Sequence, residues 1–339
     1  MRYIGIIILL VLCLTLLASS GCIINTVNAE PPSGDLGIQE NTEKSVKWSG
    51  LGMGLYSPQA SYVDTLLDNG FTELRIDIPD YQNTSWLASS KAALPGIIAK
   101  GVKVIWGVSC GAEKTITAAN WPAFRLASLD AAQWAQNIGV YEFQLGNELE
   151  SRNDGTTLTD VQLIANLKSL ATEVQAIFTS GNVSYSCFHP NIDEWVSAGK
   201  GDIDLLASNV YRVWGVHNTP NSWQDAIDAL VSGFGADGTY LTEFNLNSTG
   251  LEYYSKDEAV QATALTEMID YIKASGMNRA IYYVWKDDGE HHFGVVKADG
   301  TYRLLWSQAL LNSESVKFAA VPAKTTTVSL PGAIALIPK

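Results

Sequence analysis

Two glutamates in this sequence each lie at the end of a short β-rich run. Glu148 ends the segment 143–148, and Glu243 lies one residue before the end of the run 240–244. Two opposed carboxyl groups are what cleavage of a glycosidic bond requires, because one donates a proton and the other acts as the nucleophile. A single glutamate at a strand end is more often a solvated rim residue. The chemistry therefore depends on both glutamates reaching one site.

Three side chains near the ends of other β-rich runs could support this pair. Arg75 lies in the second run, Tyr211 ends the sixth and Trp285 ends the eighth. An arginine and a tyrosine hydroxyl beside Glu243 would keep it ionised, since a neighbouring cation and a donated hydrogen bond both favour the charged form. Glu148 must instead start protonated, which partial burial and a nearby negative charge favour.

These residues must be positioned by a chain that repeats one plan: a β-rich run, a polar loop and a helical pattern. The runs that we predict to be strands are 47–56, 71–78, 102–108, 140–146, 183–189, 203–211, 240–244 and 279–285. Glycines follow the helical patterns, where a left-handed residue often ends a helix. Eight such units predict a (β/α)8 TIM barrel, whose active site lies at the carboxyl ends of the strands.

An open, doubly wound sheet is the alternative fold. It would carry a glycine-rich phosphate loop after the first strand, but the weak candidate 50–54 lies inside that predicted strand. Two helix starts can be predicted from their spacing. Thr159 with Gln162 and Ser255 with Glu258 fit capping boxes.

Composition excludes several classes of protein. The 339 residues include 22 Lys and Arg against 35 Asp and Glu, a net charge of −13, so nucleic acid is not expected as a partner. Four Cys and four His without a CxxC or HExxH motif predict no metal centre, and no other cofactor is expected. The acidic segment 287–292 could hold Ca²⁺, although a solvated loop is the better interpretation.

The N-terminal segment has the features of an export signal. Arg2 precedes the apolar run 4–18, which is short for a membrane span, and small residues lead to Cys22. We expect a lipoprotein-like signal peptide whose removal leaves a lipidated Cys22, with simple cleavage or an uncleaved membrane helix as alternatives. The expected parts are the signal peptide at 1–21, a tether at 22–45, a catalytic barrel at 46–313 and a short β-like C-terminal extension at 314–339. The protein is accordingly expected to be extracellular, secreted or anchored at the cell surface.

Asn147 and Glu148 after the fourth run, Glu243 in the seventh and Trp285 in the eighth together resemble the clan A glycoside hydrolases, the retaining barrels that include family 5. The resemblance covers about residues 47–311. It implies that Glu148 is the acid/base and Glu243 the nucleophile. It further implies that Asn147 bonds the 2-hydroxyl of the sugar.

The same resemblance implies that Arg75 lies near the nucleophile, that Tyr211 donates to it and that Trp285 forms the floor of the subsite at the cleavage point. Two positions depart from family 5. That family usually has a histidine where this chain has Asn209, and tends to have one at the end of the third strand, where this chain has the segment 106–109. These departures leave the sugar undetermined.

Structural alternatives stay open for the supporting residues. Arg75 could pair with Asp77 or Asp80, and Tyr211 and Trp285 could be packed in the barrel or its core. The sequence alone does not decide between these roles.

Aromatic residues indicate a polymeric substrate. Sugar rings stack on aromatic faces, and several tryptophans fall in predicted strand-to-helix loops: Trp86, Trp121, Trp195, Trp214 and Trp223. Trp214, Trp106 and His189 are the further candidates for substrate contact, with packing as the alternative for the last two. We expect a monomeric, endo-acting glycosidase on a β-glucan or β-mannan. A transglycosylase, an exo-β-glycosidase and a non-catalytic carbohydrate-binding barrel are the alternatives.

Overall fold

The computed structural model describes residues 50–56, 58–110, 115–152, 158–212, 222–246, 256–287 and 292–313. The predicted signal peptide, tether and C-terminal extension lie outside these residues. Within the ranges given, no helix is both long enough and apolar enough to cross a bilayer.

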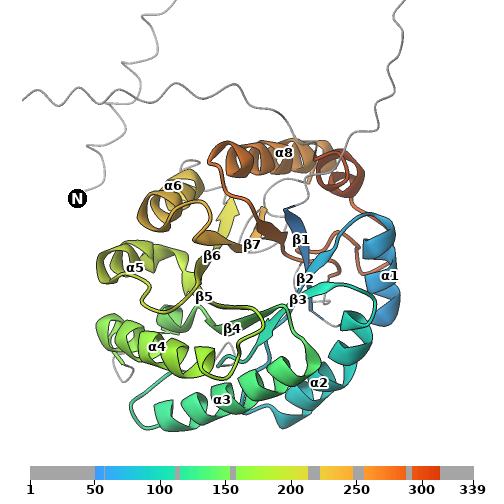
Figure 1. The fold of residues 1–339 in the computed structure, drawn as a ribbon. Coiled ribbons are helices and arrows are strands. Elements are labelled where there is room, and N and C mark those ends of the chain that lie inside the picture. Colours follow the sequence, from blue (N-terminus) through green and yellow to red (C-terminus); the bar gives the residue numbers. More distant parts are fainter. Residues whose placement is uncertain are drawn as a thin grey trace, which may run out of the picture. The chain divides into compact units, whose positions relative to one another are not determined.

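Eight parallel strands form a closed barrel in chain order (Figure 1). They are β1 (Leu51–Leu55), β2 (Glu73–Ile76), β3 (Lys103–Gly107), β4 (Glu142–Asn147), β5 (Asn182–Phe188), β6 (Leu205–Arg212), β7 (Thr239–Leu246) and β8 (Ala280–Tyr282). β1 pairs with β2 on one side and with β8 on the other, which excludes the open sheet. The predicted (β/α)8 TIM barrel is confirmed.

Helices surround the strands (Figure 1). They are α1 (Ala60–Asp68), α2 (Thr84–Ile98), α3 (Trp121–Ile138), α4 (Asp160–Gln175), α5 (Ile192–Ala198), α6 (Ser222–Phe234) and α8 (Glu258–Ala274), with the short helices η1 (Leu149–Arg152), η2 (His189–Asn191) and η3 (Trp306–Leu310). The predicted capping box of α4 is confirmed, since Thr159 and Gln162 each accept from the backbone N–H of the other. The start predicted at Ser255 is wrong. Asp257 lies directly before α8, and its carboxylate accepts from two backbone N–H groups of the first turn.

Side chains of each strand alternate between the barrel interior and the surrounding helices. The outward set is apolar and forms one large core with the helices. Inside the barrel, near the amino-terminal ends of the strands, lies a smaller apolar cluster of Ile105, Ala207, Tyr240 and Ile281. Toward the carboxyl ends the interior becomes polar, and the buried Ser186 there donates to Asn209 over 3.0 Å. The polar side chains of the site therefore start from inward-facing strand positions.

A buried ion cluster lies at the amino-terminal end of the barrel. Arg279 donates to Glu142 over 2.5 Å and lies 2.9 Å from Glu73, without the geometry of a hydrogen bond. Its guanidinium covers the ring of Tyr240, 3.5 Å from the ring centre, and the Tyr240 hydroxyl donates to Glu142. Burial raises the pKa of Glu73 to about 7, against the opposing charge of Arg279. Because these groups lie where the strands begin, they stabilise the barrel at the end away from the candidate site.

Candidate active site

Arg75 links β2, β4 and β7 inside the barrel. Its side chain is 1 % exposed and donates to Glu243 and Gln144, each over 2.8 Å, and to Asn147 over 3.0 Å. Burial alone would lower the pKa of Arg75, but the charge of Glu243 and, after it, that of Asp77 raise it overall. The guanidinium therefore stays charged, and its ion pair is made with Glu243.

Glu243 receives donors on both carboxylate oxygens. Arg75 donates to Oε1, and the Tyr211 hydroxyl at the end of β6 donates to Oε2. Burial raises the pKa of Tyr211 well above its usual value, and the negative charge of Glu243 adds to this, so the phenol stays a donor. A cation and a neutral donor on one carboxylate favour its ionised form. The structure thus places Arg75 and Tyr211 on Glu243.

Asn147 is oriented by two donors on its side-chain oxygen. Oδ1 accepts from Arg75 over 3.0 Å and from Asn209 over 3.2 Å. The amide oxygen of Asn209 in turn accepts from the hydroxyls of Ser186 and Thr242. Because the oxygen of Asn147 faces these donors, its NH₂ group points elsewhere and offers two N–H donors to an incoming hydroxyl.

Glu148 is linked to β5 through its backbone. It follows the last residue of β4, its side chain is half-buried, and its N–H donates to the carbonyl of Ser186 on β5 over 2.8 Å. Its φ of 50° lies in the left-handed region, which non-glycine residues rarely adopt. The negative charges of Glu243 and Glu148 both raise the pKa of the Tyr211 hydroxyl. The two carboxyl groups therefore lie at the same end of the barrel.

Tyr283 is a site residue that the sequence reasoning missed. It directly follows β8, is half-buried, and its ring centre lies 5.8 Å from that of Phe293, which in turn lies 5.7 Å from Tyr211. Burial raises the pKa of Tyr283 well above its usual value, and the charges of Asp77 and Glu243 contribute to the rise. Its inward position, two residues after the inward-facing Ile281, was the available signal.

Trp285, predicted to form the floor of the site, lies elsewhere. It is 2 % exposed, and its ring packs against Tyr62 at 6.4 Å, Tyr302 at 5.9 Å and Trp306 at 5.2 Å. The floor role is corrected to core packing, and Tyr283 has the aromatic position beside Glu243.

Trp106 is also a correction. It is fully buried, donates from Nε1 to Ser90 of α2 over 2.8 Å, and packs against Trp134 of α3 at 5.1 Å. It faces outward because its neighbour Ile105 belongs to the cluster inside the barrel. Substrate contact by Trp106 is therefore wrong, and core packing is the role that the structure shows.

The remaining aromatic candidates divide into four groups. His189 begins η2, its ring lies 5.6 Å from that of Phe188, and burial lowers its pKa. Of the loop tryptophans, Trp195 and Trp223 are buried and belong to the core, so their predicted exposure to sugar rings is wrong. Trp214 lies outside the described residues. Two further tryptophans, Trp86 and Trp121, are half-buried.

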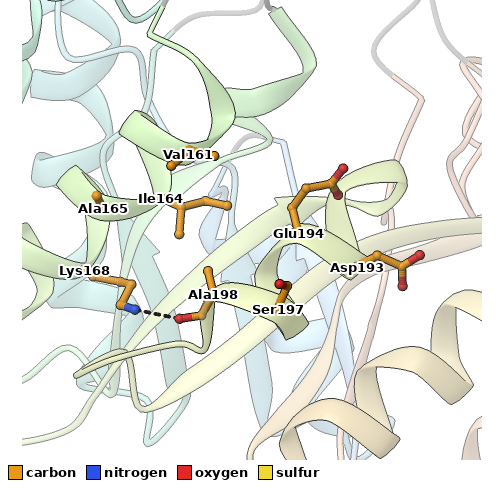
Figure 2. A pocket seen from close by; sticks show the side chains of 8 residues that line it. All are labelled: Val161, Ile164, Ala165, Lys168, Asp193, Glu194, Ser197 and Ala198. Carbon is orange, nitrogen blue, oxygen red and sulfur yellow. Dashed lines mark hydrogen bonds between the residues drawn. The ribbon is translucent and has the colours of Figure 1, made fainter.

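A groove of about 490 Å³ opens between α4 and α5 (Figure 2). Its walls are formed by Val161, Ile164, Ala165, Lys168, Asp193, Glu194, Ser197 and Ala198. The amine of Lys168 donates to the carbonyl of Ala198 over 2.8 Å. The groove belongs to the helices rather than to the carboxyl ends of the strands, and none of the predicted site residues lines it. It is not the candidate active site.

A smaller pocket of about 200 Å³ lies where β1 and β8 end. It is lined by Leu55, Tyr56, Gln59, Tyr62, Trp285, Lys286 and Asp287. Tyr56 is 45 % exposed, and a negative charge on it would raise the pKa of Tyr283. The pocket therefore lies near the site. The carboxyl end of the barrel therefore carries aromatic surface beside Glu243.

The acidic loop after β8 is only partly described. Asp287 pairs with the buried Arg303 over 3.0 Å and accepts from the N–H of Gly294 over 2.6 Å, while residues 288–291 lie outside the described ranges. Among the residues that the structure covers, no group of three or more His, Cys, Asp or Glu is arranged to hold a metal ion.

Solved structures show where else this fold occurs. The chain is similar to the catalytic domain of the major endoglucanase from Xanthomonas campestris pv. campestris, with a TM-score of 0.54, 16 % identity, and coverage of 79 % of this chain and 94 % of that one. It is also similar to a β-1,4-mannanase of glycoside hydrolase family 113, with a TM-score of 0.54, 14 % identity, and coverage of 79 % and 98 %.

A third similar structure is a family 5 xyloglucanase from Paenibacillus pabuli in complex with ligand. The TM-score is 0.53 at 15 % identity, and the match covers 78 % of this chain and 97 % of that one. No protein-family model and no curated protein sequence matches the chain. At these identities the likeness establishes the barrel fold.

Proposed function

We propose that this protein is a retaining glycoside hydrolase of the cellulase type that cuts within the chains of a β-linked polysaccharide. The observation that carries the proposal is the environment of Glu243, whose two oxygens accept from Arg75 and Tyr211 while Arg75 also holds Asn147, the neighbour of Glu148. This arrangement places a carboxyl group with two donors on its oxygens at the end of β7 and a second carboxyl group at the end of β4. Those are the two groups that a double displacement needs.

In the first step, Glu243 attacks the anomeric carbon as the bond to the leaving oxygen breaks. Glu148 gives its proton to that oxygen. Glu243 becomes a neutral ester, and Arg75 and Tyr211 release the charge that they had stabilised. The N–H groups of Asn147 bond the sugar 2-hydroxyl, a contact that strengthens in the transition state.

In the second step, water enters from the side that the leaving group vacated. Glu148 removes a proton from this water, the new oxygen–carbon bond forms, and the bond to Glu243 breaks. The carboxylate returns to its donors on Arg75 and Tyr211. Two inversions give net retention of the anomeric configuration.

The substrate class rests on two further observations. The carboxyl end of the barrel carries the half-buried Tyr283 and the exposed Tyr56, aromatic side chains on which sugar rings can stack. The similar solved structures are named as an endoglucanase, a β-1,4-mannanase and a xyloglucanase. A β-glucan or β-mannan outside the cytoplasm fits both these names and the export signal expected at residues 1–21.

The test is a panel of soluble β-glucan, β-mannan and xyloglucan, with reducing ends and viscosity followed together. An endo-acting enzyme lowers viscosity before many reducing ends appear, whereas an exo-acting one does the reverse. Proton NMR before mutarotation should show the β-anomer first. An α-anomer appearing first would mean inversion and would remove Glu243 from the role of nucleophile. Longer products on addition of acceptor oligosaccharide would instead indicate a transglycosylase.

A further inference from the structure

Glu150 is a buried carboxylate that the steps above do not use. It lies in η1, two residues after Glu148, and is 4 % exposed. Three neutral groups donate to it: the Tyr185 hydroxyl over 2.7 Å, the Trp195 indole over 2.6 Å and the Phe188 backbone N–H over 3.3 Å. Burial raises its pKa, while the donors from Trp195 and Tyr185 oppose the rise.

Tyr185 connects this carboxylate to the backbone beside Glu148. While its hydroxyl donates to Glu150, the same oxygen accepts from the N–H of Leu149 over 3.1 Å. On the other side, the N–H of Glu148 donates to Ser186 on β5. The left-handed turn at Glu148 is thus fixed to β5 both directly and through the Tyr185 hydroxyl.

We propose that Glu150 is a positioning residue that holds Glu148 in place for proton transfer. This inference rests on the proposed function. A carboxylate only accepts, so it satisfies all three donors at once. The substitution Glu150→Gln keeps the size but turns an NH₂ group toward at least one of these donors. The turn at η1 must then move, and a proton donor works only within hydrogen-bond reach of the leaving oxygen.

A residue that merely supports the fold would affect all substrates alike. β4 offers a matched control at its other end, because Glu142 is also fully buried and also accepts from a tyrosine hydroxyl, that of Tyr240. It lies where the strand begins, far along the strand from Glu148. The substitution Glu142→Gln therefore disturbs a similar buried carboxylate without touching the turn of Glu148.

The experiment compares kcat/KM of the wild type, Glu150→Gln and Glu142→Gln on two substrates, at a temperature where circular dichroism shows each protein folded. One substrate is an unactivated oligosaccharide of a polysaccharide that the wild type cleaves. The other is the dinitrophenyl β-glycoside of the same sugar, whose leaving group needs no proton. For Glu150→Gln we expect a loss of about a hundredfold on the oligosaccharide, mainly in kcat, and less than about threefold on the activated glycoside. For Glu142→Gln, kcat/KM should fall by the same factor on the oligosaccharide and on the activated glycoside.

Equal factors on both substrates for Glu150→Gln, or no loss on either, would overturn the positioning role. If that variant does not fold, Tyr185→Phe replaces it, because it removes only the hydroxyl between Glu150 and Leu149. It should show the same selectivity with a smaller factor, and equal factors there would overturn the inference as well. A wild type that cleaves no polysaccharide of the panel would instead contradict the proposed function, and this inference with it.

Discussion

The two glutamates of the site are held in different ways, and the difference suits their roles. Both carboxylate oxygens of Glu243 accept hydrogen bonds, from Arg75 and Tyr211, and the backbone N–H of Glu148 donates to Ser186 on β5. A nucleophile must stay ionised and point at one carbon, so donors on both oxygens suit it. An acid/base must reach the leaving oxygen, so a turn whose backbone is fixed to β5 suits Glu148.

Replacing Glu243 by alanine should abolish turnover, because no carboxylate remains to attack. Azide should restore part of the activity, since the small anion fits the space that the side chain leaves. The product should be a glycosyl azide of inverted configuration, identified by NMR and mass spectrometry. A glycosyl azide with the substrate's own configuration would argue against attack from the side of Glu243.

Substitutions at Tyr283 and Trp106 distinguish an aromatic residue of the site from one of the core. Tyr283→Ala should lower kcat/KM by roughly tenfold, about 1.4 kcal/mol, because it removes an aromatic face beside Glu243 on which a sugar ring can stack. Trp106→Phe should leave kcat/KM within about twofold and lower the free energy of unfolding by about 1 kcal/mol, the contribution of the hydrogen bond to Ser90. Kinetics and urea unfolding of both variants check this. A large loss of kcat/KM for Trp106→Phe with little loss for Tyr283→Ala would instead assign substrate contact to Trp106.

At the scale of elements, the sequence predicts strands and helices well where local patterns repeat. The capping box at Thr159 follows from short-range chemistry, and it is present. β8 is different, because it has only three residues and its register with β7 shifts between Leu241 and Phe244. The floor role of Trp285 was implied by the resemblance, and the sequence did not distinguish this residue from Tyr283, two positions earlier. Contacts between distant segments, as for Glu150 with Tyr185, leave no periodic signal.

The ion cluster at the start of the strands makes stability depend on pH. Burial raises the pKa of Glu73 from 4.5 to about 7, so the folded state binds its proton more tightly than the unfolded chain does. The contribution of Glu73 to the free energy of unfolding is therefore full below pH 4.5 and is lost as the pH rises through 7.

Glu73→Gln should remove this dependence. Between pH 4.5 and 7.5, the stability of the variant relative to the wild type should rise by at most roughly 3 kcal/mol, the free energy that corresponds to such a pKa difference. Urea unfolding of both proteins at several pH values measures it. A difference that stays constant over this range would show that Glu73 titrates normally in the folded barrel.

At the scale of the whole molecule, attachment to a membrane is a prediction from the sequence around Cys22 alone. If Cys22 is lipidated, the full-length protein should fractionate with membranes, because the lipid chains bury in the bilayer. Cys22→Ser should release the protein or leave it as an unprocessed precursor. Cell fractionation followed by mass spectrometry of the mature N-terminus checks this. Recovery of the unaltered mature protein in the soluble fraction without detergent would contradict the anchor.

The pairing of β1 with β8 also determines when the barrel can close. The two strands come from opposite ends of the described chain, so β1 acquires its second partner only after almost the whole barrel has been synthesised. Bringing such distant segments together is slow, and until then β1 keeps an uncovered edge that can pair with other chains. During synthesis the growing chain is therefore unable to complete its fold early. If the chain is exported, as residues 1–21 predict, that delay would keep it unfolded enough to pass through a translocation channel, and a chaperone that covers the first strands would limit their aggregation.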